Sequence, residues 1–124
     1  MDERDPLTEK VIGAAIEVHR ILGPGLLESV YQKCLCHELM LRGMDYRREV
    51  ELPIVYKGAA LDCNLFMDIV VSDQLVIELK AVEKLQPIHE AQLLTYLKLS
   101  RIHRGLLINF NVPLLKDGIK RMVL

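Results

Sequence analysis

Apolar residues recur at helical spacing through the first third of the chain, and this pattern predicts two helices. The first is expected to begin at Pro6, because Asp5 is a favourable N-cap and proline is favoured at the first helical position. Gly23 is expected to end it. The second is expected over residues 24–43, with Gly43 as its stop. The first third is therefore predicted to be an α-hairpin.

The pattern in the middle of the chain is typical of strands, with turn signals at Lys57-Gly58 and Ser72-Asp73. The strands expected there form a meander of REVELPIVYKG, LDCNLFMDIVV and QLVIELKAV. A helix over 87–100 and a buried strand over 104–111 follow, while residues 114–124 show no decisive pattern. The order α-α-β-β-β-α-β predicts an α/β fold with one mixed β-sheet.

Length and composition fit one folded domain over residues 1–124, because 51% of the residues are hydrophobic and 27% are charged. No apolar run is long enough to span a bilayer, and the N-terminus opens with acidic residues, unlike a signal peptide. We therefore expect a cytoplasmic protein without membrane contact. The three cysteines are odd in number, so reduced thiols are expected.

The formal net charge of -1 conceals an uneven distribution of charge. Residues 1–62 hold 8 Lys and Arg against 11 Asp and Glu, whereas residues 81–124 hold 7 against 3. A basic C-terminal third could lie along a phosphate backbone, but an ordinary solvated surface explains the same counts.

Three charged residues interrupt strands that are otherwise apolar. Asp68 lies within LFMDIVV, and Glu78 and Lys80 lie within LVIELKAV. Continuous apolar runs are typical of strands covered on both faces, where an isolated charge is costly. These charges are therefore expected to pair with one another or to hold a cation.

The loop between these two strands decides whether the acidic residues meet. A three-residue loop over 72–74 pairs Val71 with Leu75. That register places Asp68 opposite Glu78, with Cβ atoms about 5 Å apart. A two-residue loop would place them on opposite faces. We expect the three-residue register or an equivalent bulge.

Two facing carboxylates repel each other unless a cation lies between them, and hard divalent cations prefer oxygen ligands. Asp68 and Glu78 therefore suggest Mg²⁺ or Mn²⁺. Lys80, one pleat further on, could orient or deprotonate a water and neutralise charge on a phosphate. Phosphodiester hydrolysis suits these groups. A buried cluster that only neutralises its own charges fits the spacing equally well.

Asp68, followed on the next strand by Glu78-Leu79-Lys80, resembles the D…(D/E)xK signature of the PD-(D/E)XK nuclease superfamily. A closer resemblance, over about residues 7–123, is to the GxxExxxR family of small bacterial and archaeal proteins. The segments that carry it are LGPGLLESVY, VIELKAV, HEAQLLTYL and GLLINFN. The resemblance implies a restriction-endonuclease-like core, in which a mixed β-sheet has helices on both faces.

The resemblance also implies roles for individual residues in the two central strands. Asp68 and Glu78 would be metal ligands, and the backbone carbonyl of Leu79 would be a third ligand. Lys80 would be the catalytic lysine, with Mg²⁺ or Mn²⁺ as the cofactor.

Three catalytic residues are implied outside those strands. Gln92 and Tyr96 match a QxxxY element and share one helical face at i and i+4. Glu28 matches a helical glutamate that completes the metal site. Taken alone, Gln92 and Tyr96 could be residues at a core edge, and Glu28 could be a first-turn carboxylate at the positive end of its helix.

Three positions depart from the family's pattern. Met67 stands where the proline of the superfamily's name is expected, and Phe66 stands where many relatives carry a basic residue. Gln32 stands where the family name calls for arginine, four residues after Glu28. The changes at Phe66 and Gln32 remove potential phosphate contacts.

The expected function is a metal-dependent nuclease that hydrolyses phosphodiester bonds in nucleic acid, with DNA favoured over RNA as the partner. A homodimer would enlarge the surface that so small a protein offers to a duplex. One alternative is a catalytically inactive, nuclease-derived module that binds nucleic acid. Another is a protein-interaction module of the toxin–antitoxin kind, in which the fold is only a scaffold.

Overall fold

The computed structural model describes residues 5–124. Its elements in chain order are α1 (Pro6–Leu22), α2 (Glu28–Leu41), β1 (Tyr46–Glu51), β2 (Ile54–Tyr56), β3 (Ala59–Leu61), β4 (Phe66–Val71), β5 (Leu75–Lys80), α3 (Pro87–Ser100), β6 (Arg104–Asn109), the 3₁₀ turn η1 (Leu115–Gly118) and β7 (Ile119–Val123). Within residues 5–124, no helix is long and apolar enough to cross a membrane.

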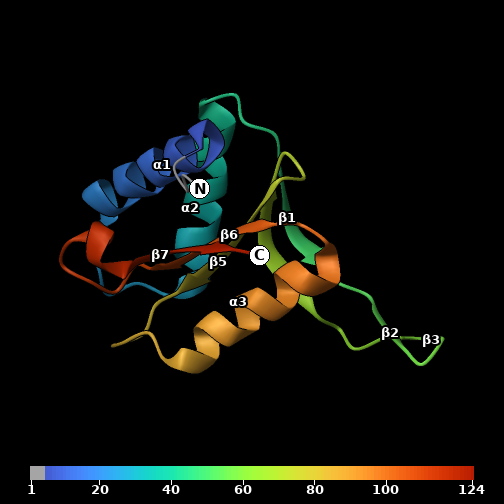
Figure 1. Ribbon diagram of the computed structural model, residues 1–124. Helices are drawn as coiled ribbons and strands as arrows, with labels where there is room; N and C mark the ends of the chain where they lie inside the picture. Colours follow the sequence, from blue (N-terminus) through green and yellow to red (C-terminus); the bar gives the residue numbers. More distant parts are fainter. Residues whose placement is uncertain (1–4) are drawn as a thin grey trace.

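Five strands form one mixed sheet in the order β1-β4-β5-β6-β7. Strands β5 and β6 are parallel, and the other neighbours are antiparallel. Helices α1 and α2 lie on one face of the sheet and α3 lies on the other (Figure 1). Each face has its own apolar core. This architecture confirms the predicted α/β fold and is consistent with a restriction-endonuclease-like core.

Helix α1 has the predicted bounds, because its caps are local. The carboxylate of Asp5 accepts hydrogen bonds from the backbone N–H of Thr8 at 2.9 Å and from its hydroxyl at 2.6 Å. These bonds satisfy an amide that the first turn would otherwise leave free. Arg104 of β6 forms an ion pair with the same carboxylate. The helix ends at Leu22, where Gly23 adopts a φ of 71°.

Helix α2 begins at Glu28 rather than at residue 24, which corrects the prediction. The hydroxyl of buried Tyr31 donates to the carbonyl of Gly23 at 2.6 Å and accepts from the N–H of Leu26 at 3.2 Å. The Tyr31 ring also stacks on Phe110, with 4.5 Å between ring centroids. This tertiary anchor holds the preceding segment in a loop and outweighs its local helix signal.

The predicted meander is present as β1, β4 and β5, but its first strand is interrupted. Strand β1 ends at Glu51, Leu52 is buried, and Pro53 lacks the N–H that a sheet ladder needs. Strands β2 and β3 then pair with each other as a hairpin whose turn, Lys57-Gly58, has φ values of 49° and 81°. We call residues 52–61 the arm, because this hairpin projects from the body of the protein (Figure 1).

The C-terminal segment, which showed no decisive pattern, forms the second edge of the sheet. Strand β7 pairs antiparallel with β6, and the strand expected over 104–111 ends at Asn109. Strand β7 is an edge strand and is only partly buried, so it can carry the charged residues Lys120 and Arg121 among its apolar residues. These charges obscure the apolar pattern that would have predicted a strand. The turn before it requires glycine, since a Cβ at Gly118 would lie 2.2 Å from the carbonyl oxygen of Asn109.

We expect Asp5→Ala to lower the free energy of unfolding by about 1 kcal/mol at pH 7. Burial alone would raise the pKa of Asp5, but the hydrogen bonds from Thr8 and Arg104 bring it down from 3.8 to about 2. The stabilisation is therefore complete above about pH 4 and is lost as the pH falls towards 2. Urea denaturation at pH 7 and pH 3 should show a smaller difference at pH 3. The exposed Asp45→Ala serves as the control, and a difference independent of pH would contradict this account.

Candidate active site

Strands β4 and β5 are joined by a tight turn and separate at their other end. Val71 pairs with Leu75 across a three-residue loop, which confirms the predicted register, and the ladder stops after three pairs. Ser72 and Asp73 both have positive φ, of 52° and 54°, so the turn has the conformation favoured in tight hairpins. The residues beyond the third pair are Asp68 and Glu78.

The side chains of Asp68 and Glu78 lie in the opening between the two strands. The backbone N–H of Leu79 donates to Oδ2 of Asp68 at 2.8 Å, and the N–H of Asp68 donates to Oε1 of Glu78 at 3.2 Å. Each carboxyl group thereby replaces a backbone carbonyl of the interrupted ladder. Glu78 is only 5% exposed. The two acidic residues converge as the sequence predicted.

This acidic pair retains a proton at neutral pH. Burial, followed by the negative charge of Asp68, raises the pKa of Glu78 to about 9. Burial also raises the pKa of Asp68, although the hydrogen bond from Leu79 opposes that shift. A cation bound here would therefore displace a proton.

Strand β1 adds an acidic residue that the sequence analysis missed. Glu49 lies between two ladder pairs of β1 with β4, has no partner of its own and adopts a φ of 54°. The register is unchanged on either side, so Glu49 faces Asp68, and a positive φ at a non-glycine residue is the kind of local strain that clusters at functional sites. The charge of Glu49 raises the pKa of Asp68. The place of Glu49 near Asp68 follows from the register of β1 on β4. No tight turn fixes that register, so the sequence alone did not reveal it.

Lys80 lies at the end of a chain of polar side chains that reaches helix α3. Its Nζ donates to Oε1 of Gln92 at 3.4 Å, and Nε2 of Gln92 donates to the hydroxyl of Tyr96 at 3.1 Å. Tyr96 is buried, and burial followed by the charge of Glu78 raises its pKa. The structure therefore brings the QxxxY residues to the lysine and anchors them at the core edge.

Glu28, the first residue of α2, lies within the electrostatic influence of Asp68 and Lys80. Partial burial and the charge of Asp68 raise its pKa, whereas Lys80 lowers it. Within residues 5–124, no group of three or more His, Cys, Asp and Glu side chains is arranged to hold a metal ion. Glu28 is thus within electrostatic reach, but it does not complete a three-carboxylate cluster.

The three departures from the family pattern occupy different surroundings. Met67 is buried in the core under α3 and Gln32 is buried on α2, at 3% and 7% exposure. Phe66, two residues before Asp68, leaves 42% of its surface exposed. Of these three, only Phe66 therefore presents a large side chain to solvent beside the acidic pair.

Asn109 fixes the chain where it leaves the site. Its side-chain amide donates to the carbonyl of Val82 at 2.9 Å and accepts from the N–H of Val82 at 3.1 Å. The next residue, Phe110, donates its N–H to the carbonyl of Lys80 at 2.9 Å. These bonds extend the β5–β6 pairing past the last ladder residues and hold Lys80 in place.

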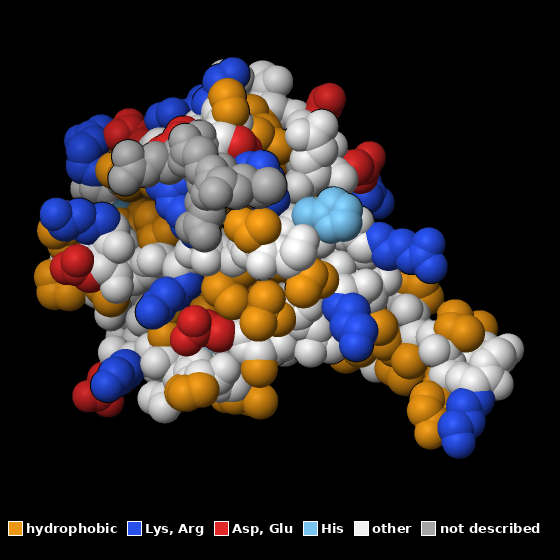
Figure 2. Space-filling view, in the orientation of Figure 1, with side chains coloured by type: hydrophobic (Ala, Val, Ile, Leu, Met, Phe, Trp, Pro, Cys, Tyr) orange, Lys and Arg blue, Asp and Glu red, His pale blue; other side chains and the backbone are white. Residues whose placement is uncertain are grey.

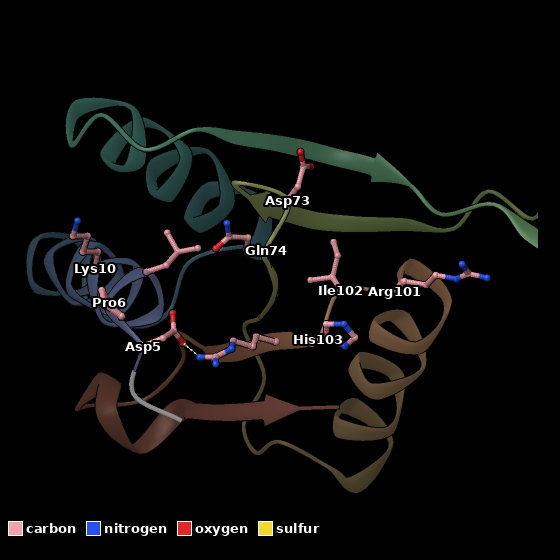
Figure 3. Close-up of a pocket in the computed structure, with 10 residues that line it drawn as sticks. Asp5, Pro6, Lys10, Asp73, Gln74, Arg101, Ile102 and His103 are labelled. Carbon is pink, nitrogen blue, oxygen red and sulfur yellow. Dashed lines mark hydrogen bonds and ion pairs between the residues drawn. The ribbon is translucent and has the colours of Figure 1, made fainter. Parts of the chain in front are cut away.

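A hollow beside the β4–β5 turn lies at the opposite end of the sheet from the acidic pair. Its volume is about 620 Å³. Figure 3 shows Asp5 and Lys10 on the α1 side, Gln74 beside the β4–β5 turn, and His103 before β6. Asp68 and Glu78 are not among the residues that line this hollow.

The model of the PD-(D/E)XK nuclease superfamily matches residues 5–122. The chain belongs to this superfamily. The assignment of the superfamily's signature to Asp68 and to Glu78-Leu79-Lys80, with methionine in place of the proline, stays a prediction. Comparisons with curated proteins and with solved structures gave no match. Membership of the GxxExxxR family stays a prediction.

In metal-free protein, we expect the free energy of unfolding to fall as the pH rises from about 5 to about 8. The pKa of Glu78 is higher in the folded than in the unfolded chain, about 9 against 4.5, so folding takes up a proton in this range. The slope attributable to Glu78 is at most about 1.4 kcal/mol per pH unit. Urea denaturation in EDTA should show a flatter pH dependence for Glu78→Gln. The exposed Glu51→Gln should keep the wild-type slope, and equal slopes in all three proteins would contradict the shifted pKa.

Proposed function

We propose that this chain is a divalent-metal-dependent nuclease that hydrolyses phosphodiester bonds in nucleic acid. The observation that carries the proposal is the convergence of Asp68 and Glu78 at the strand opening, with Lys80 beside them. The superfamily supports a nuclease-type function and a nucleic-acid partner. We propose DNA rather than RNA as that partner, a homodimer as the assembly and the GxxExxxR family as the branch of the superfamily.

The donor set suits a hard cation. Asp68 and Glu78 offer carboxylate oxygens, the ligands that Mg²⁺ and Mn²⁺ prefer, and a cation would offset the burial and the charge of Asp68 that raise the pKa of Glu78. The backbone carbonyl of Leu79 and, less directly, Glu28 would supply further oxygens. When bound, such an ion lowers the pKa of a water and neutralises charge on phosphate oxygens.

The protein's own groups would position the other participants. Lys80 can donate hydrogen bonds from Nζ to a water or to a phosphate oxygen, and its positive charge favours the anion that develops during hydrolysis. Gln92 limits the directions in which Nζ can point, because it accepts one of the lysine's hydrogen bonds. Tyr96 in turn holds the Gln92 amide. Gln92 and Tyr96 are thus positioning residues in this scheme.

Metal binding should release close to one proton per ion near pH 7, because Glu78 has a pKa of about 9 in the free protein. Calorimetric titration with Mn²⁺ in two buffers of different ionisation enthalpy measures both the affinity and the proton count. We expect Asp68→Asn and Glu78→Gln to lose most of the heat, and Glu51→Gln to keep it. Identical titrations in all four proteins would remove the metal site from the proposal.

Lys80→Ala should lower the rate of nucleic-acid cleavage by about 100- to 10,000-fold while leaving Mn²⁺ affinity largely intact. Gln92→Ala should lower the rate less, because it frees the lysine without removing its charge. The assay is nicking of a supercoiled plasmid and cleavage of labelled single-stranded and duplex oligonucleotides. Lys84→Ala, an exposed lysine four residues further on, is the control. Nucleic-acid binding by the wild type without cleavage would identify the protein as an inactive binding module.

A further inference from the structure

The arm is exposed on nearly all sides, and two short strands alone do not make a stable unit. Isolated two-stranded hairpins are marginally stable in water, and β2 and β3 contain three residues each. Its large apolar side chains face solvent, with Val55 at 67% and Tyr56 at 61% exposure. Figure 2 shows hydrophobic side chains over the projecting arm and no acidic side chain on the face in view. This exposed apolar surface is therefore suited to binding a partner.

The chain's exposed aromatic rings gather on the arm and at its base. Of six aromatic residues, only Tyr56 on the arm and Phe66 at the start of β4 are exposed. Phe66 is opposite Glu51, the last residue of β1, and lies two residues before Asp68. The arm consequently leaves the sheet at the end that carries the acidic pair.

Charge on the arm favours an anionic partner. Lys57 is the one charged residue among residues 52–61, and its Nζ lies 5.5 Å from the centre of the Tyr56 ring. A second copy of the chain is less well suited, because three-residue strands offer little edge for pairing with another sheet. A nucleic-acid strand, which presents both phosphates and flat base faces, matches a lysine beside an exposed ring.

We propose that Tyr56 and Phe66 are stacking platforms for unpaired bases, so that the protein acts on single-stranded nucleic acid or on unpaired segments next to a duplex. This inference rests on the proposed function and names its substrate class. In a duplex the base faces are already stacked and are closed to a protein ring. The five residues from Leu52 to Tyr56 reach at most about 17 Å, so the two rings would engage bases a few nucleotides apart.

The test is fluorescence anisotropy of a labelled 20-nucleotide single strand and of its duplex, in EDTA so that no cleavage occurs. We expect the wild type to bind the single strand at least about tenfold more tightly than the duplex. Tyr56→Ala and Phe66→Ala should each weaken single-strand binding by about 5- to 150-fold, since stacking contributes about 1–3 kcal/mol per base. Tyr56→Phe should bind like the wild type, whereas Tyr56→Leu, which keeps apolar bulk without a ring, should not.

Val55→Ala is the matched control, because it removes an exposed aliphatic side chain from the same arm. Equal or tighter binding of the duplex, or unchanged binding by the alanine variants, would overturn the inference. Light scattering that shows a wild-type dimer and a monomeric Tyr56→Ala would assign the arm to a second copy instead. Cleavage of duplex without single-strand preference would overturn only this inference, whereas absence of both binding and cleavage would overturn the proposed function as well.

Discussion

Two hydrogen bonds, from the N–H of Asp68 to Glu78 and from the N–H of Leu79 to Asp68, constrain the centre of the sheet. Two carboxyl groups buried at the opening of two strands can be accommodated only if they share a proton or hold a cation. The backbone N–H groups of Leu79 and Asp68 donate hydrogen bonds to these carboxyl oxygens. Each N–H needs such an acceptor, because the interrupted ladder no longer supplies a backbone carbonyl. The strands can separate here because the carboxyl groups replace the lost backbone acceptors, and the carboxyl groups fit here because the strands separate.

The surrounding elements keep this opening in a fixed shape. On one side, β6 continues its pairing with β5 up to Lys80 and fixes the departing chain through Asn109. On the other side, β1 adopts a positive φ at Glu49 and places a further negative charge near Asp68. Helix α3 supplies Gln92 to the lysine. The excess of negative charge is built into three neighbouring strands, so it does not depend on one flexible side chain.

Sequence reasoning succeeded where a short-range signal and the tertiary structure agree. The bounds of α1 follow from Asp5 and Gly23, and the β4–β5 register follows from a three-residue loop. It failed where a distant contact decides the outcome. Tyr31 holds the loop before α2 through hydrogen bonds and packs on Phe110, 79 positions further along the chain, which no local pattern reveals. The position of Glu49 opposite Asp68 was missed for the same reason, because it depends on how β1 lies against β4.

Under the proposed function, the insertion of the arm between β1 and β4 separates substrate contact from chemistry. Once β1 and β4 are paired, a longer connection between their adjacent ends adds only a small loop-closure cost. The arm can therefore change in length or composition without moving Asp68, whose position is set by the tight turn at the other end of β4 and by the bonds to β5. An exposed arm that joins the sheet at the end carrying the acidic pair is accordingly where, under the proposed function, differences in nucleic-acid preference can arise while the acidic pair stays the same.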